Sequence, residues 1–293
     1  NTDWALLVLQ LKTGYQALLE NAGALDANVI AVGVSVQGSY NEERDVLTAV
    51  EQPVINGRHL RSDFAEIFKK GVVIQNDIDA AATYRARRTG NAFFVYIYLG
   101  YQIGAGIVVD GKLLNGYEGR TAEIAHLPIG DSETVCEGCG QKYCLETSLG
   151  KGALLEEYFG KKFPVHAEGY EEEWGTFLDA VYRGDIKAKR AVRVKANLLA
   201  KLIIVLLSIC RAPEVMISGI PRLLYDEMYP DVINMLRRWE SLYALHELRF
   251  DEDAEKTILI GTMDIAYQKW RPDFDNGKIW TDNMEEGLIS DPT

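Results

Sequence analysis

Apolar and polar residues follow one another along this chain in patterns that predict helices and buried strands. From Trp4 to Ala24 the apolar residues recur at helical spacing, and the Asn-Ala-Gly sequence near the end of this segment is typical of a helix stop. The apolar run from Asn28 to Gly38 predicts a buried strand that leads into a glycine turn. Further along, we predict helices at 60–70 and 78–90 and strands at 71–77, 92–100, 104–114, 214–220 and 248–250.

The order of these elements indicates the fold class. Strands and helices alternate first, and the strands 92–100 and 104–114 then form a predicted hairpin that turns at Asp110-Gly111. Mostly helical sequence with two further strands follows. Alternating strands and helices combined with a hairpin predict an α/β fold with a mixed sheet.

Polar and glycine residues come at the carboxyl ends of three predicted strands, at Gln37-Gly38, Asn76-Asp77 and Gly100. Open α/β sheets bind ligands at this edge. An amide and a carboxylate there can accept hydrogen bonds from sugar hydroxyls, and the carboxylate can take a proton from a hydroxyl that is being phosphorylated. An Asn-Asp pair before a helix is also a common helix cap, so two interpretations stay open at this point.

Composition and charge exclude some functions. The 293 residues carry a formal net charge of −12, and a strongly acidic segment is repelled by phosphate backbones, so we do not expect it to bind DNA by itself. No apolar run reaches the roughly 18 residues that a membrane span needs. The sequence shows no secretory signal pattern, and its four cysteines do not resemble a disulfide framework. We therefore expect a cytoplasmic protein and, since the chain begins at Asn1, a fragment of it or a trimmed form.

Three of the four cysteines lie close to a histidine, in the order His126, Cys136, Cys139 and Cys144. One imidazole and three thiolates suit a closed tetrahedral zinc site, which leaves no open position for a catalytic water and is therefore structural. The alternative is a set of buried apolar thiols. The polar residues Glu137, Gln141 and Lys142 favour a loop over a core, so we predict Zn²⁺ bound by these four residues.

These segments carry a resemblance to a known family. The sequence TAEIAHLPI, followed by CEGCGQKYCLE, resembles the signature of the ROK family of repressors, open reading frames and sugar kinases, whose usual form is GEIGH and then CxCGxxGCLE. The resemblance continues in order from about Asn28 to Ile265 through VIAVGVSVQG, VVIQNDIDAAA, YIYLGYQIGAGIVVDGKLLNG and APEVMISGI. It implies the actin-like ATPase fold of hexokinase or ROK type, in which a sugar binds between two α/β lobes.

The resemblance also implies a division of the chain. We expect 1–107 to form the first lobe in part, with 258–272 returning to it, and 108–257 to form the second lobe with the zinc loop. The hinge should lie near Gly106–Leu113 and again near the final helix. Strands of the first lobe should precede Asn1, and 273–293 should form a loose tail. A homodimer or higher oligomer is the usual assembly in the family.

The family's ligand residues carry over onto matching positions. The resemblance implies sugar contacts from Gly38, Asn76, Asp77, Glu123, His126 and Glu146. In a ROK kinase the residue that matches Asp77 is the catalytic base. Asp79, where the family usually has Asn, is then the expected helix cap, and Gln37 replaces the expected proline beside Gly38.

The phosphate-binding segments of the family are absent or altered. No DxGGT sequence occurs, and the GTG turn, the GGG turn and the late DAG-type loop read Gly100-Tyr101-Gln102, Ser218-Gly219-Ile220 and Asp253-Ala254-Glu255. We therefore expect the sugar-sensing effector domain of a transcriptional repressor of carbohydrate metabolism, in the branch that resembles N-acetylglucosamine and xylose repressors. It would bind a monosaccharide or sugar phosphate and reach DNA only through a helix-turn-helix domain before Asn1. The alternatives are an ATP- and Mg²⁺-dependent sugar kinase, such as a glucokinase or N-acetylhexosamine kinase, and a sugar-binding scaffold protein without a DNA partner.

Overall fold

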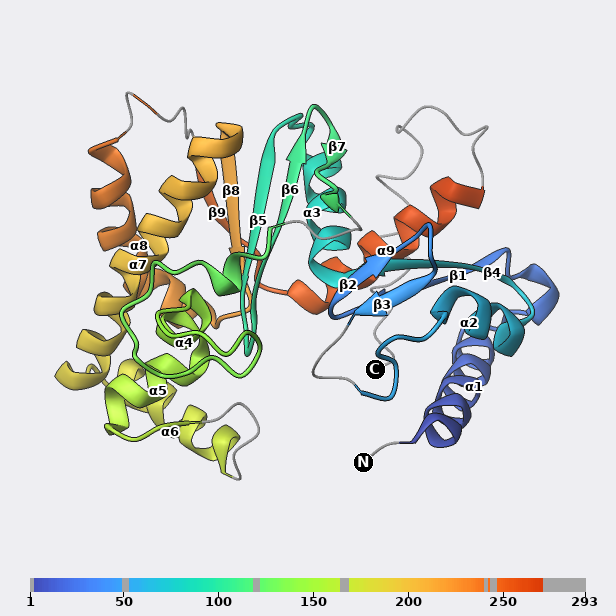
Figure 1. The fold of residues 1–293 in the computed structure, drawn as a ribbon, viewed down its shortest axis with the longest axis horizontal. Coiled ribbons are helices and arrows are strands. Elements are labelled where there is room, and N and C mark those ends of the chain that lie inside the picture. Colours follow the sequence, from blue (N-terminus) through green and yellow to red (C-terminus); the bar gives the residue numbers. More distant parts are fainter. Residues whose placement is uncertain are drawn as a thin grey trace.

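The computed structural model describes residues 3–48, 53–117, 122–163, 169–239, 242 and 247–270. Two α/β lobes lie side by side, with one pair of helices between them (Figure 1). The first lobe comes from the N-terminal part of the chain and the second from its middle. The mixed α/β architecture that the sequence predicts is confirmed.

The first lobe consists of two small sheets and two helices. Strands β1 (Ala31–Val36) and β4 (Gly71–Asn76) pair in parallel, and β2 (Ser39–Asn41) pairs with β3 (Val46–Thr48) in antiparallel fashion. Helices α1 (Trp4–Asn21) and α2 (Leu60–Phe68) pack beside them, and Asp3 caps α1 by accepting a hydrogen bond from the Leu6 amide.

The second lobe is built on a five-stranded mixed sheet in the order β7-β6-β5-β8-β9. Its strands are β5 (Phe94–Leu99), β6 (Ile103–Val109), β7 (Lys112–Leu113), β8 (Glu214–Ser218) and β9 (Glu247–Phe250). Helices cover one face: α4 (Leu145–Leu149), α5 (Lys151–Phe159), α6 (Tyr170–Tyr182), α7 (Ile186–Cys210) and α8 (Arg222–Arg237). Their apolar side chains and that face of the sheet form the largest core. No helix in the described part of the chain is both long and apolar enough for a membrane span.

Helices α3 (Asp77–Thr89) and α9 (Ala254–Trp270) cross between the lobes. They approach closely at Gly261, where a Cβ atom would lie 2.3 Å from the carbonyl oxygen of Ala80. The Arg87 guanidinium pairs with Asp264 at 2.5 Å across this contact. Because α3 begins at the end of β4, its N-terminus lies at the edge of the sheet where ligands bind in open α/β folds.

One buried polar cluster joins α3 to the second sheet and to α9. Asp251, which follows β9, accepts hydrogen bonds from Arg85 at 2.6 Å and from the Tyr96 hydroxyl at 2.7 Å. Arg85 also donates to the hydroxyl of Thr257 on α9 at 2.7 Å. The cluster therefore fixes the C-terminal half of α3 against both neighbours.

Three local predictions need correction. The Asp110-Gly111 turn exists, with both residues at positive φ, but it joins β6 to β7. Strands β5 and β6 instead turn through 100–102. The hairpin β2–β3 was not predicted, because each strand has only three residues. The cap of α3 is Asn76 and not Asp79. The lobe boundaries and the hinge at Gly106–Leu113 stay predictions, and the predicted tail at 273–293 lies outside the described residues.

Candidate functional site

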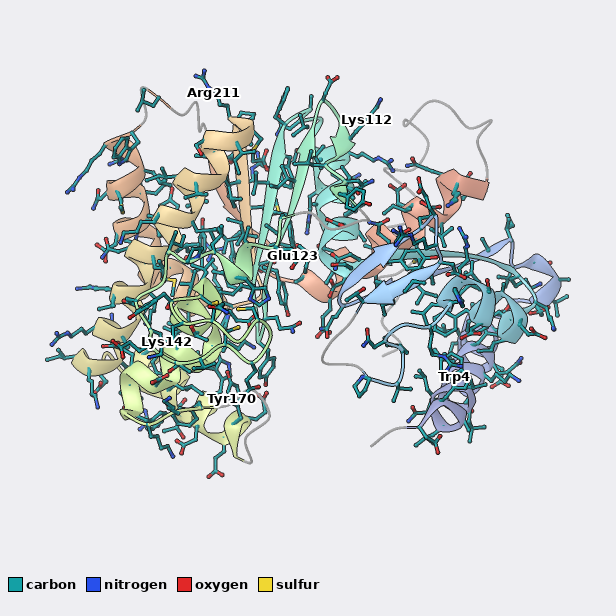
Figure 2. The ribbon with its side chains drawn as sticks, viewed as in Figure 1. Trp4, Lys112, Glu123, Lys142, Tyr170 and Arg211 are labelled. Atoms are coloured by element: carbon teal, nitrogen blue, oxygen red, sulfur yellow. The ribbon has the colours of Figure 1, made fainter. Side chains whose placement is uncertain are left out.

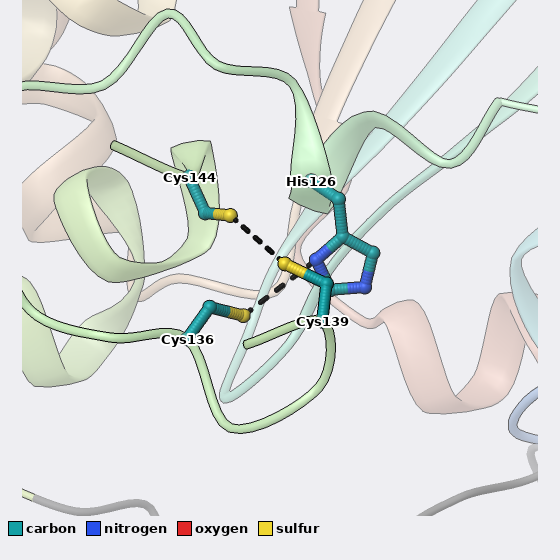
Figure 3. Close-up of side chains that lie close together, drawn as sticks. All are labelled: His126, Cys136, Cys139 and Cys144. Carbon is teal, nitrogen blue, oxygen red and sulfur yellow. Dashed lines mark hydrogen bonds between the residues drawn. The ribbon is translucent and has the colours of Figure 1, made fainter. Parts of the chain in front are cut away.

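The four predicted metal ligands come together in one loop of the second lobe (Figure 3). Their ligand atoms all lie within 4.8 Å of one another. The thiols of Cys139 and Cys144 are 3.2 Å apart, and Cys136 Sγ lies 3.6 Å from His126 Nδ1. All four cysteines of the chain are free of disulfides, so these close sulfur contacts are not covalent bonds.

This geometry fits a tetrahedral metal ion. Zinc–sulfur bonds of about 2.3 Å in a tetrahedron place two sulfur atoms roughly 3.8 Å apart. The Cys139–Cys144 separation of 3.2 Å is somewhat shorter, and the 4.8 Å limit on all the ligand-atom separations is compatible with such a tetrahedron. Gly138 allows the chain to pass the imidazole, because a Cβ atom there would lie 3.0 Å from His126 Cε1. With one imidazole and three thiolates, His126, Cys136, Cys139 and Cys144 could hold a closed structural site.

The N-terminus of α3 carries the predicted amide and carboxylate. The Asn76 side chain accepts hydrogen bonds from the amides of Ile78 and Asp79, at 2.9 and 3.0 Å, and so caps the helix. Its Nδ2 group donates to the carbonyl oxygen of Gly38 at 3.1 Å. The Asn76 side chain therefore caps α3 and also contacts Gly38, another predicted ligand position. The helix cap and the predicted sugar contact are the same residue.

Two carboxyl groups follow Asn76 in the first turn of α3. Burial raises the pKa of Asp77 to about 6, although the Ile78 amide, which donates to its carboxylate, opposes the shift. Burial raises the pKa of Asp79 to about 7, with further contributions from the negative charges of Asp77 and Glu123. Within the described residues no cation offsets either shift. Two acidic groups of near-neutral pKa can accept hydrogen bonds from hydroxyls or exchange protons with them.

Glu123 connects this cluster to the metal loop. It lies near the junction of the two lobes (Figure 2) and accepts a hydrogen bond from the Ser39 hydroxyl at 3.0 Å. It directly precedes the short 3₁₀ helix Ile124–His126, which contains the histidine of the candidate metal cluster. Glu146, in the first turn of α4, has a carboxylate oxygen 3.9 Å from Cys136 Sγ. Glu123, His126 and Glu146 therefore all lie next to the candidate metal cluster, in sequence or in space.

Sequence reasoning missed two residues of this region. Ser39 lies beside the predicted Gly38 turn, so its hydrogen bond to Glu123 had a weak local signal. Tyr98 had none, because its position in an apolar strand suggested an ordinary core residue. The ring of Tyr98 instead lies against two of the altered phosphate turns. A Cβ atom on Gly100 would be 2.2 Å from Tyr98 Cε1, and one on Gly219 would be 2.9 Å from Cε2.

The electrostatic surroundings of Tyr98 also place its side chain near the ligand carboxylates. Burial raises the pKa of the Tyr98 hydroxyl, and the negative charges of Asp77 and Glu255 raise it further. The third altered segment, which contains Glu255, thus contributes negative charge to the same region. An aromatic ring and a carboxylate therefore lie at segments that the family resemblance predicts to bind phosphate, a group that is usually held by glycine amides and cations.

A surface groove of about 410 Å³ lies elsewhere, around the start of α7. Among its lining residues, Lys189 and Arg193 both pair with Glu227, at 2.9 and 3.2 Å. Because none of the predicted site residues lines this groove, we assign it no part in the site.

Comparisons with known proteins agree with this geometry. The model of the ROK family matches residues 10–252, and the chain belongs to this family. Its fold is the actin-like ATPase fold of the ROK sugar kinases.

Characterised relatives with similar sequences are named as amino-sugar kinases. The chain is 28% identical over 206 residues to an N-acetyl-D-glucosamine kinase of Pectobacterium carotovorum, covering 61% of this chain and 68% of that protein. It is 29% identical over 147 residues to an N-acetylmannosamine kinase of Vibrio cholerae, covering 48% of this chain and half of that protein.

Solved structures with the same fold include both classes. A ROK hexokinase from Thermus thermophilus has a TM-score of 0.71 at 22% identity, covering 90% of this chain and 87% of that one. A ROK transcriptional regulator, a homologue of the E. coli MLC protein, has a TM-score of 0.76 at 19% identity, covering 92% and 70%. At these identities the similarity shows the fold alone.

Proposed function

We propose that this chain binds a monosaccharide or its phosphate through Gly38, Asn76, Asp77, Glu123, His126 and Glu146. The contacts at 3.0–3.1 Å that join Gly38 to Asn76 and Ser39 to Glu123 support one continuous ligand region. The half-buried carboxyl groups at the start of α3 would supply acceptors for vicinal hydroxyls. The names of the relatives make N-acetylated amino sugars the first ligands to test.

The His126, Cys136, Cys139 and Cys144 cluster would hold structural Zn²⁺. The metal would supply cross-linking of the loop and no hydrolytic chemistry, because four protein ligands fill its coordination. The four ligand residues, cross-linked by the metal, would hold Glu123 and Glu146 in position. Loss of the cross-link would release both carboxylates from their positions.

For the outcome of sugar binding, we propose sensing without phosphoryl transfer. The observation that carries this proposal is the ring of Tyr98, which packs against both Gly100 and Gly219. Phosphoryl transfer depends on preorganised donors and cations around the transferred group, and removing them weakens the transition state most. The chain would then be the effector domain of a regulator that reaches DNA through a separate helix-turn-helix domain and acts as a cytoplasmic homodimer.

The second candidate is an amino-sugar kinase, and the names of the curated relatives favour it. In that case Asp77 would be the catalytic base. Its pKa of about 6 suits a group that takes a proton from a sugar hydroxyl near neutral pH. ATP and Mg²⁺ would then have to bind with Tyr98 displaced from the glycine turns.

One experiment separates the two candidates. Full-length protein is incubated with ATP, Mg²⁺ and N-acetylglucosamine, N-acetylmannosamine, glucose or xylose, and phosphorylated sugar is quantified. The sensor proposal predicts stabilisation of the protein by one sugar without turnover. Turnover at an ordinary enzyme rate, about 1 s⁻¹ or faster, would establish the kinase instead. Sugar-dependent DNA binding of the full-length protein completes the test, because a scaffold protein would show neither activity.

A further inference from the structure

Two neighbouring residues of the first lobe contact both halves of the proposed sugar region. The carbonyl oxygen of Gly38 accepts a hydrogen bond from Asn76 Nδ2 at 3.1 Å, and the hydroxyl of Ser39 donates to Glu123 Oε1 at 3.0 Å. Asn76 precedes α3, whereas Glu123 precedes the 3₁₀ helix of the second lobe. Ser39 therefore links the two lobes, although it is not among the predicted sugar residues.

The first lobe holds Ser39 on a firm support. Ser39 begins β2, which pairs with β3, and the next residue, Tyr40, is buried and donates from its hydroxyl to Asp45 at 2.8 Å. The Asp45 carboxylate also accepts from the backbone amides of Arg61 and Ser62 in the first turn of α2, at 2.8 and 3.1 Å. These bonds tie the β2–β3 hairpin to α2, so the position of the Ser39 hydroxyl is fixed by its own lobe.

The backbone before Glu123 is strained. Ala122 has a φ of 52°, in the left-handed region that favours glycine. The ROK signature usually has glycine at this position, where the present chain reads AEIAH instead of GEIGH. A strained residue persists where the surrounding structure holds it in place. The amide of Ile124 contributes on one side by donating to the Ala122 carbonyl, and the hydrogen bond from Ser39 contributes at the neighbouring side chain.

The Glu123 side chain depends on Ser39 for its orientation. Glu123 is exposed, and in the described part of the chain the Ser39 hydroxyl is the one hydrogen-bond donor to its carboxylate. A free glutamate side chain samples several rotamers, and selecting one of them on ligand binding costs entropy. A hydroxyl that holds the carboxylate beforehand lowers this cost.

We propose that Ser39 is a positioning residue, which holds the carboxylate of Glu123 in place for the sugar from the opposite lobe. This inference rests on the proposed sugar function and adds a residue to it. A carboxylate has about four acceptor positions on its two oxygens, so the bond to Ser39 leaves others for sugar hydroxyls. Because donor and acceptor belong to different lobes, sugar affinity then depends on how the lobes are placed as well as on the ligand residues.

The first part of the test needs no sugar. Urea unfolding of the full-length protein is measured for the wild type, Ser39→Ala, Glu123→Ala and the double variant. We expect Ser39→Ala to raise the unfolding equilibrium constant about fivefold more in the wild type than in the Glu123→Ala background, because the hydrogen bond exists only when both partners are present. Additive effects would mean that Ser39 does not hold Glu123. The inference would then fail even if Ser39→Ala weakened sugar binding, since Ser39 would be contacting the sugar itself.

The second part measures sugar affinity by calorimetry with N-acetylglucosamine, N-acetylmannosamine, glucose and xylose. With the sugar that binds the wild type, we expect Ser39→Ala to weaken binding about three- to tenfold. Ser39→Thr should restore most of the affinity, because it keeps the hydroxyl and suits a strand. The matched control is Ser35→Ala, an equal truncation at an exposed position of β1, which should bind as the wild type does.

The outcomes separate this inference from the sugar proposal. If none of the four sugars binds the wild type, the proposed function fails, and the unfolding measurements still decide whether Ser39 holds Glu123. If a sugar binds the wild type and Ser39→Ala equally well, or if Ser39→Thr loses as much affinity as Ser39→Ala, the sugar function stands and Ser39 has no positioning role.

Discussion

The start of α3 and the two glycine turns of the second lobe are neighbouring regions with opposite character. At α3 the carboxyl groups of Asp77 and Asp79 are half-buried with no cation among the described residues to offset their raised pKa values, and hydrogen bonds link this region to the loop of the candidate metal cluster. At the turns, the ring of Tyr98 packs against Gly100 and Gly219. The comparison supports the proposal of a ROK domain that keeps acceptors for a sugar while protein atoms fill its phosphate side.

The largest effect is expected from breaking the metal loop that supports the first region. Cys139→Ser removes one of four ligands, and metal content should fall from near one ion per chain to a small fraction. Structural metal binding is coupled to folding, so we expect a loss of roughly 3 kcal/mol or more and a Tm lower by about 6–12 °C.

The matched control for that loop is Cys210→Ser, because Cys210 is buried in α7 far from the metal ligands in sequence. It should keep full metal content. Elemental analysis and thermal unfolding check both variants. A Cys139→Ser protein that retains one ion per chain would show that the four residues do not form the metal site.

The next effect concerns sugar affinity. Asp77→Asn keeps the size of the side chain and removes its charge, so the charge-assisted hydrogen bonds to sugar hydroxyls should weaken. We expect affinity to fall about 10- to 100-fold, measured by calorimetry with the sugar that stabilises the wild type.

Asp110→Asn is the control for this change, since Asp110 is exposed in a turn at positive φ that asparagine tolerates. Metal content should be unchanged in both variants. Equal sugar affinity of Asp77→Asn and the wild type would place the ligand somewhere else.

The pH dependence of stability provides a further test of the start of α3. Burial raises the pKa of Asp79 to about 7, so the folded protein holds a proton that the unfolded chain, with a pKa near 3.8, releases. This carboxyl therefore destabilises the fold increasingly as pH rises from about 4 to about 7, and its effect is constant above that.

Asp79→Asn should remove this dependence. The variant should be more stable than the wild type at pH 7.5 by about 1–3 kcal/mol, and the difference should vanish at pH 4. Urea unfolding at a series of pH values provides the measurement. A difference that stays constant with pH would mean that Asp79 titrates normally.

The smallest effect is expected on the phosphate side. Tyr98→Thr removes the ring between the glycine turns, and we expect weak AMP-PNP binding to appear, with a rise in Tm of about 1–2 °C at millimolar nucleotide. The same change should lower the stability of the free protein by about 1–3 kcal/mol, because it leaves a cavity.

Tyr117→Thr is the matched control, since Tyr117 is 85% exposed and should affect neither property. If Tyr98→Thr gains no nucleotide binding while the wild type already binds AMP-PNP, Tyr98 does not close the phosphate side. The kinase alternative would then gain support.

The sequence predicted the metal cluster well because its ligands are close in the chain and their chemistry is specific. His126, Cys136, Cys139 and Cys144 needed only one loop to bring them together. The strands and helices of the first lobe were also predictable from periodicity, except for the three-residue strands of the β2–β3 hairpin. Short strands carry too few residues for an alternating pattern to stand out.

The contacts that cross between distant segments could not be predicted in this way. The hydrogen bond from Ser39 to Glu123 joins residues 84 positions apart, and nothing local marks either as a partner. Tyr98 lies in a strand whose sequence pattern is that of an ordinary core strand. Only the three-dimensional structure shows that its ring packs against Gly100 and Gly219. The helix cap was assigned to Asp79 because the family resemblance reserved Asn76 and Asp77 for the sugar. In the structure α3 begins directly at the end of β4, so Asn76 is the cap.

The double role of Asn76 also bears on how the specificity of this domain can evolve. The side chain that would contact the sugar already satisfies two amides of α3, and losing such a cap costs about 1 kcal/mol. Any substitution there changes ligand preference and folding together, so few replacements would survive selection. Glu123 is exposed and its side chain makes no capping hydrogen bond to the 3₁₀ helix that follows it, so mutations there meet less resistance from stability. New sugar preferences in related proteins should therefore arise first on the side of the metal loop, while position 76 changes last.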